Sequence, residues 1–124
     1  MDYLVLYLLF NSLLNDTSIT HHTRLVTIDR SGYGYTQFGR ADTSILHQSK
    51  LILKATSNFL PKIGYSVLGR SFGGSIAACI AGIDTQGVKK LILVSSSLGP
   101  GLEKTYPISY TINNAYSVLF FLGL

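Results

Sequence analysis

The chain has 124 residues, which is enough for one domain with a modest hydrophobic core and too few for two. Hydrophobic residues make up 47% and charged residues 13%, a balance that excludes an intrinsically disordered chain. The formal charge of +4 comes from ten basic residues that are scattered along the chain. Only Lys89 and Lys90 are adjacent, and without a basic stripe we expect no binding to nucleic acid.

The chain has a single cysteine, Cys79, which excludes an internal disulfide. No Cys/His spacing fits a zinc site, so we expect neither a metal nor a cofactor, and we expect Cys79 to be a small buried apolar residue. The apolar runs 3–10 and 118–124 are shorter than the roughly 20 residues that span a bilayer. Because Asp2 stands where a signal peptide would carry positive charge, we expect a core element at 3–10 and a cytoplasmic location.

The first half of the chain predicts a helix, a strand and a second helix. Residues 3–15 are apolar and end in polar residues, which favours a helix. Residues 24–29 are rich in β-branched side chains and end at a Gly-rich turn, which indicates a buried strand. The next helix has three candidate N-caps and apolar positions at helical spacing, and Pro61 ends it. The caps are Asp42, Thr43 and Ser44, and the apolar positions are Ile45, Ile52, Ala55 and Phe59.

The second half continues the alternation with a strand at 65–69, a helix at 72–82 and a strand at 90–95. The last stretch, 109–124, is apolar and is predicted to be helical. Continuous apolar strands alternating with helices are typical of a parallel sheet covered on both faces, so we expect an α/β fold with a partial doubly wound sheet. Three strands make a small sheet, which indicates part of a larger one.

Residues 69–74, Gly-Arg-Ser-Phe-Gly-Gly, lie between the strand at 65–69 and the helix at 72–82. A serine between two glycines at such a junction sits on a tight turn with its hydroxyl presented outward, as a nucleophile requires. About 0.1 matches to Gly-x-Ser-x-Gly are expected by chance in this composition, so the strand and helix around it carry much of the argument. The alternative is a glycine-rich turn in which Ser71 is incidental. A phosphate-binding loop is disfavoured because the P-loop lysine is missing.

Two motifs in this order give the chain a resemblance to the α/β-hydrolase superfamily. The first is Asp29 to Gly34, Asp-Arg-Ser-Gly-Tyr-Gly, which resembles the family's Asp-x-x-Gly-x-Gly turn after a central strand. The second is the serine turn, and the resemblance covers roughly residues 20–100 as a central fragment of the fold. It implies a core at 1–102 and the start of a cap or lid at 103–124.

The resemblance implies that Ser71 is the nucleophile and that the backbone N–H of Phe72 is one donor of the oxyanion hole. It also implies a small-molecule ester or amide substrate for the intact family. A serine at this position disfavours family members that use an aspartate nucleophile. Acyl hydrolysis of the esterase, lipase or peptidase type fits better.

The chain departs from the family in the partners of the nucleophile, which follow in the order serine, acid, histidine. Downstream of Ser71 the only acids are Asp84 and Glu103, and there is no histidine. The three histidines, His21, His22 and His47, all precede Ser71, and we expect them to be exposed and structural. The His-Gly segment that supplies the second oxyanion donor is absent too.

Two further positions could supply an acid. Serines stand at 95–97, where some family members carry the acid. The turn position of Asp29 favours a structural role.

We therefore expect a serine hydrolase fragment that has little or no turnover alone, because nothing in it acts as a general base. Two alternatives stay open. The chain is a non-enzymatic remnant of a hydrolase, or it is one half of a split enzyme that a complementary hydrolase fragment completes.

Overall fold

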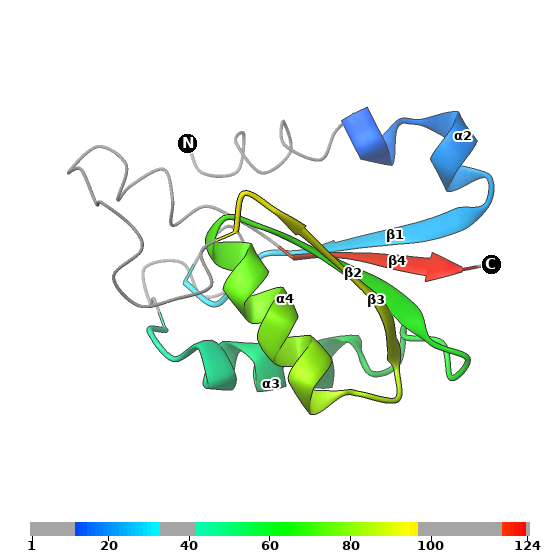
Figure 1. Ribbon diagram of the computed structural model, residues 1–124. Coiled ribbons are helices and arrows are strands. Elements are labelled where there is room, and N and C mark those ends of the chain that lie inside the picture. The colour runs from blue at the N-terminus through cyan, green and yellow to red at the C-terminus, as the bar shows by residue number, and fades with distance from the viewer. Residues whose placement is uncertain (1–11, 33–41, 97–117, 124) are drawn as a thin grey trace.

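The computed structural model describes residues 12–32, 42–96 and 118–123 (Figure 1). Its elements in chain order are α2 (Thr17–Thr20), β1 (Thr23–Ile28), α3 (Ile45–Thr56), β2 (Tyr65–Arg70), α4 (Phe72–Ile83), β3 (Val88–Val94) and β4 (Val118–Gly123). The strands and helices predicted between residues 24 and 95 are therefore present in the expected order. Of the helix predicted at 3–15, residues 12–14 are helical and residues 3–11 lie outside the described residues.

The four strands form one sheet in the order β1-β4-β2-β3. Strands β2 and β3 pair in parallel, with Arg70 opposite Val94 at their carboxyl ends. Strand β4 is antiparallel to both β1 and β2, so β1 and β2 run in the same direction. The three predicted strands therefore share a direction, and the turns that follow them lie at one edge of the sheet, where sites of α/β folds form.

Strand β4 corrects the prediction of a helix over 109–124. Residues 118–123 form a strand that pairs with β1 from Thr23↔Gly123 to Ile28↔Val118 and with β2 from Ser66↔Phe121 to Gly69↔Val118. An apolar run of this length has no periodicity that separates helix from strand. The two neighbouring strands decide the outcome, because they supply hydrogen-bond partners on both sides of the backbone. Residues 103–117 lie outside the described residues, so the division into core and cap stays a prediction.

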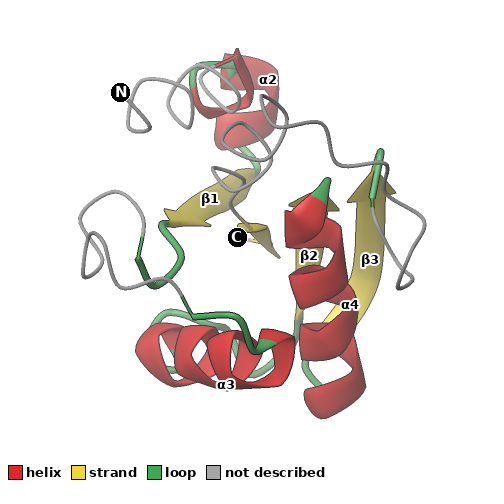
Figure 2. Ribbon diagram, turned by 90° about the vertical axis from the view of Figure 1, so that its left-hand side faces the viewer, coloured by secondary structure: helices red, strands yellow, loops and turns green. Residues whose placement is uncertain are grey.

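The main core lies on the face of the sheet that α3 and α4 cover, side by side (Figures 1 and 2). It joins one buried residue of α3, two of β2 and three of α4: Ile52, Tyr65, Val67, Ile76, Ala77 and Ile80. A smaller cluster lies on the opposite face, where Leu68 of β2 packs against Leu13, Leu14 and Leu25. Successive residues of β2 thus face opposite layers, as the period of a strand requires.

The exposure of strand β3 differs from the prediction that helices cover both faces of the sheet. It is an edge strand of the described sheet, and its residues Leu91 to Val94 are 36–41% exposed. An exposed apolar edge is a surface that natural proteins normally cover or interrupt with charge. Cys79, expected to be buried, is half-buried in α4.

Candidate active site

Ser71 is the single residue between the end of β2 and the start of α4. Its backbone has φ 52° and ψ −125°, a conformation that a residue with a side chain rarely adopts. Such strain costs about 1–3 kcal/mol and persists only where the surroundings hold it. The Ser71 side chain is half-buried, so the turn leaves it partly open to solvent. This geometry is the sharp strand-to-helix turn that the sequence motif predicts.

Two hydrogen bonds hold the turn. The Ser71 N–H donates to the carbonyl oxygen of Val94 at 3.0 Å, which ties the turn to the end of β3. The Gly74 N–H donates to the Ser71 carbonyl oxygen at 2.9 Å and closes the first turn of α4. The neighbouring strand and the helix thus both fix the strained residue.

The glycines on either side of Ser71 are required by close packing. A Cβ atom at Gly69 would lie 2.3 Å from the Gly73 carbonyl oxygen and 2.7 Å from the Ala77 Cβ. A Cβ atom at Gly74 would lie 2.0 Å from the Oγ of Ser96, which itself donates to the Gly69 carbonyl oxygen at 3.2 Å. The strand, the helix and the segment after β3 therefore converge at the serine turn with no room for another side chain.

Phe72 is the first residue of α4, directly after Ser71. Helix geometry leaves the first N–H groups of α4 without an acceptor within the helix, and the helix dipole favours negative charge at this end. Ser71 makes no side-chain capping bond to them. These N–H groups therefore lie beside the serine, at the end of the helix that attracts an anion.

A buried polar group that the sequence analysis did not single out adjoins the turn. The Arg30 guanidinium carbon lies 4.7 Å from the centroid of the Phe72 ring, and the Arg30 Nη1 donates to the Gln48 Oε1 at 3.3 Å. Arg30 is 3% exposed and Gln48 is 1% exposed. No local pattern marks this group, because its three members come from the turn after β1, from α3 and from α4.

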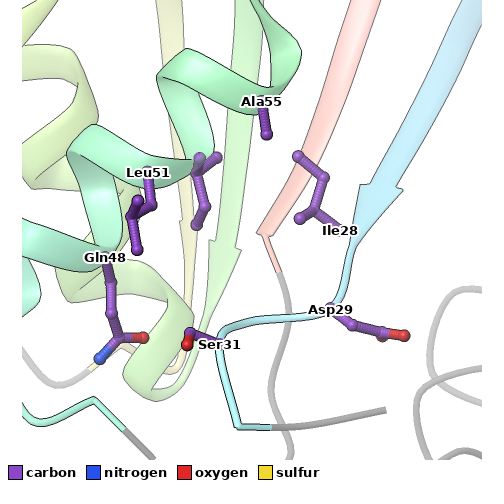
Figure 3. A pocket seen from close by; sticks show the side chains of 7 residues that line it. Ile28, Asp29, Ser31, Gln48, Leu51 and Ala55 are labelled. Carbon is purple, nitrogen blue, oxygen red and sulfur yellow. The ribbon is translucent and has the colours of Figure 1, made fainter. Parts of the chain in front are cut away.

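A cavity of about 260 Å³ lies between the end of β1 and α3 (Figure 3). Its lining is mostly apolar and comprises Ile28, Asp29, Ser31, Gln48, Leu51, Ile52 and Ala55. In Figure 3 the Asp29 carboxyl points away from α3. Gly32 in the same turn has φ 92°, which explains why the motif has a glycine there.

The histidines are exposed, as predicted, and one of them has a carboxylate partner. The His47 Nδ1 pairs with the Asp42 Oδ2 at the start of α3. The other Asp42 oxygen accepts the Ser44 N–H at 2.9 Å, and the Ser44 Oγ accepts the His47 N–H at 3.1 Å as the N-cap. The Ser44 N–H first, and His47 second, lower the pKa of Asp42. The Asp42–His47 pair therefore lies at the N-terminus of α3, beside the Ser44 cap.

Of the two acids that follow Ser71 in the sequence, the one that the structure describes, Asp84, is not brought to it. Asp84 is at the opposite end of α4, a helix of 12 residues and thus about 18 Å long. Its carboxylate accepts the Tyr65 hydroxyl at 2.6 Å and the Gly87 N–H at 2.9 Å. Burial, and then this carboxylate, raises the pKa of Tyr65. Glu103 lies outside the described residues.

A family model described as the alpha/beta hydrolase fold matches residues 5–114. The chain therefore belongs to the α/β-hydrolase fold family, and the predicted fold class is confirmed. Neither a curated protein nor a solved structure matches the chain. Among the helices of the described residues, none has the length and apolarity that crossing a bilayer requires.

Proposed function

We propose that the chain is a serine hydrolase of the acyl-transfer type and that Ser71 is its nucleophile. The observation that carries the proposal is the positive φ of Ser71 at the junction of β2 and α4. A strained nucleophile at a helix start, with backbone N–H groups beside it, is the arrangement that acyl transfer uses. We take an activated ester as the substrate class. The cytoplasmic location expected from the sequence stays a prediction.

The reaction at Ser71 is acylation. The Ser71 Oγ forms a bond to the carbonyl carbon of the ester, and the bond to the leaving alkoxide or phenoxide breaks. In the tetrahedral intermediate the carbonyl oxygen carries negative charge, which the Phe72 N–H stabilises together with the positive end of α4. The hydroxyl proton passes to a base in solution, because the sequence has no histidine after Ser71 and Asp84 lies at the far end of α4. Acylation is slow without an internal base, and hydrolysis of the acyl-enzyme is slower than in an enzyme with a complete triad.

The test is acetylation by p-nitrophenyl acetate, followed by intact mass with and without imidazole. We expect one acetyl group on Ser71 and a rate that rises with imidazole concentration, because imidazole supplies the missing base. Ser71→Ala removes the adduct, whereas Ser75→Ala, a serine on the same helix, is the matched control that retains it. Acetylation that ignores imidazole, or that persists in Ser71→Ala, would contradict the proposal.

A second candidate is one half of a split enzyme, completed by a complementary hydrolase fragment. The exposed apolar edge of β3 favours it, because Leu91 to Val94 would be buried by a further strand there. Co-purification with a second hydrolase chain that carries an acid and a histidine supports this candidate. A chain that acetylates and deacetylates unaided with steady turnover excludes it.

A further inference from the structure

Arg30 is a charged residue that is almost completely buried, beside the proposed nucleophile turn. Placing a charge in the interior is unfavourable unless specific partners compensate for the lost water. Among the partners of the Arg30 guanidinium are the Gln48 Oε1, 3.3 Å from its Nη1, and the face of the Phe72 ring, 4.7 Å from its central carbon. A cation over an aromatic face is attracted by the ring's quadrupole, and the attraction is strongest where water is excluded.

Gln48 fixes the orientation of this group. Its Nε2 donates to the carbonyl oxygen of Asp42 at 2.5 Å, which turns its Oε1 toward Arg30. The contacts therefore run from the start of α3, through Gln48 and Arg30, to the first residue of α4. They join elements that the backbone connects only through long segments.

The last residue in this series of contacts is Phe72, which directly follows Ser71. The Phe72 ring and the Phe72 backbone N–H share one Cα, so holding the ring restricts the backbone at the start of α4. Ser71 has a strained φ of 52°, and its turn would relax if the neighbouring backbone were free to move. The two backbone bonds of the turn, from Ser71 and from Gly74, depend on the same geometry.

We propose that Arg30 is a positioning residue for the serine turn and acts through its stacking on the Phe72 ring. The effect of Arg30 on the reactivity of Ser71 rests on the proposed function, because the backbone that Arg30 holds carries the Phe72 N–H, the proposed oxyanion donor. The role proposed for Arg30 is exerted through Phe72 and involves no step of the reaction itself. Arg30 keeps the Phe72 N–H and the Ser71 Oγ in the relative position that acylation needs.

The direct test is amide hydrogen exchange at the turn in Arg30→Met, which keeps an unbranched side chain, shorter than that of arginine, and removes its charge. We expect exchange of the Ser71 and Gly74 N–H groups to accelerate about tenfold, since the cation–π contact in a water-excluded setting is lost. The Asp84 N–H, bonded to the Ile80 carbonyl oxygen at the other end of α4, should keep its rate. Ile52→Val is the control, because it weakens the buried core while Gln48, Arg30 and Phe72 are all retained, and it should not single out the turn.

Phe72→Leu approaches the same contact from the other side and covers the case in which Arg30→Met does not fold. It should give the same local acceleration, and adding Arg30→Met to it should produce no further change at Ser71 and Gly74. Uniform acceleration along α4, or none at the turn in either variant, would overturn the inference. Arg30→Lys retains the charge and should restore part of the protection, which a purely steric role would not explain.

The reactivity of Ser71 separates this inference from the proposed function. Phosphonylation of Ser71 by a fluorophosphonate should slow about tenfold in Arg30→Met and keep its rate in Ile52→Val. If the wild-type Ser71 is not phosphonylated but the exchange pattern holds, the proposed nucleophile is wrong and the role of Arg30 in the turn stands. If Ser71 is phosphonylated at the same rate in Arg30→Met and exchange is unchanged, the inference is wrong and the proposed function stands.

Discussion

The backbone of Gly69 lies so close to that of Gly73 that a Cβ atom on Gly69 would be 2.3 Å from the Gly73 carbonyl oxygen. Side chains do not tolerate such a distance, so β2 and α4 meet through their glycines. The close approach makes the turn at Ser71 sharp, because the helix begins directly against the strand that precedes it.

Gly69→Ala should therefore destabilise the chain by about 1–3 kcal/mol or more, as expected for overpacking against backbone atoms. The matched control is Gly82→Ala, the same substitution at a glycine of α4, the helix against which Gly69 packs. Gly82 is an exposed residue of α4 with no atom within 4 Å of an added Cβ. This control should stabilise the chain by about 0.5–1 kcal/mol through helix propensity. Urea denaturation measures both, and equal effects of the two substitutions would contradict the packing described for β2 and α4.

The strain at Ser71 gives a second prediction, on stability alone. Glycine adopts positive φ without a steric cost, so Ser71→Gly should relieve the strain. We expect it to be more stable than Ser71→Ala by about 1 kcal/mol, after allowing for the greater freedom of glycine in the unfolded chain. Thermal unfolding of the two variants, neither of which has the hydroxyl, checks this. A Ser71→Ala variant at least as stable as Ser71→Gly would mean that the turn is not strained.

The serine turn could be predicted from the sequence because its causes are local. An apolar strand-like run, small side chains and four glycines fall within residues 65–82, and together they favour the same strand, turn and helix. The Ser44 cap of α3 was predictable for the same reason, since a capping residue acts on the next turn of its own chain.

Two features depended on distant residues and could not be predicted. Residues 118–123 form a strand because β1 and β2 lie on either side of them, and nothing in their own sequence separates strand from helix. The contact between Arg30 and Phe72 exists only once the turn after β1 and the start of α4 are brought together. Arginine in a turn is normally solvated, so its burial gave no signal in the sequence.

Asp42 predicts a loss of stability in acid. In the folded chain the pKa of Asp42 is below its usual value of 3.8, chiefly because its carboxylate accepts the Ser44 N–H. The ionised carboxylate therefore stabilises the folded chain. This stabilisation is complete above the pKa of Asp42 in the unfolded chain and is lost as pH falls through the pKa in the folded chain. We expect α3 to lose stability below about pH 4, and Asp42→Asn to reduce the slope of stability against pH in that range. Unfolding free energies between pH 5 and pH 2, values chosen to bracket the transition, check this. An unchanged slope in Asp42→Asn would show that the carboxylate makes no such contribution.

Tyr65→Phe tests whether stability and reactivity can be separated. The Tyr65 hydroxyl donates to the Asp84 carboxylate at 2.6 Å, and hydrogen bonds to charged groups contribute about 1.5–3 kcal/mol. We expect a loss of that size in the free energy of unfolding. The rate of Ser71 phosphonylation in the folded protein should not change, because Asp84 follows the far end of α4. A fall in that rate at a temperature where the variant is fully folded would contradict this separation.

The most direct test of the central claim is the location of a fluorophosphonate adduct on the full chain, mapped by peptide mass spectrometry. The positive φ of Ser71 and the N–H groups at the start of α4 predict an adduct on Ser71, none in Ser71→Ala, and faster labelling when imidazole is added. An adduct on another serine, or equal labelling of Ser71→Ala, would show that the turn between β2 and α4 does not present a nucleophile.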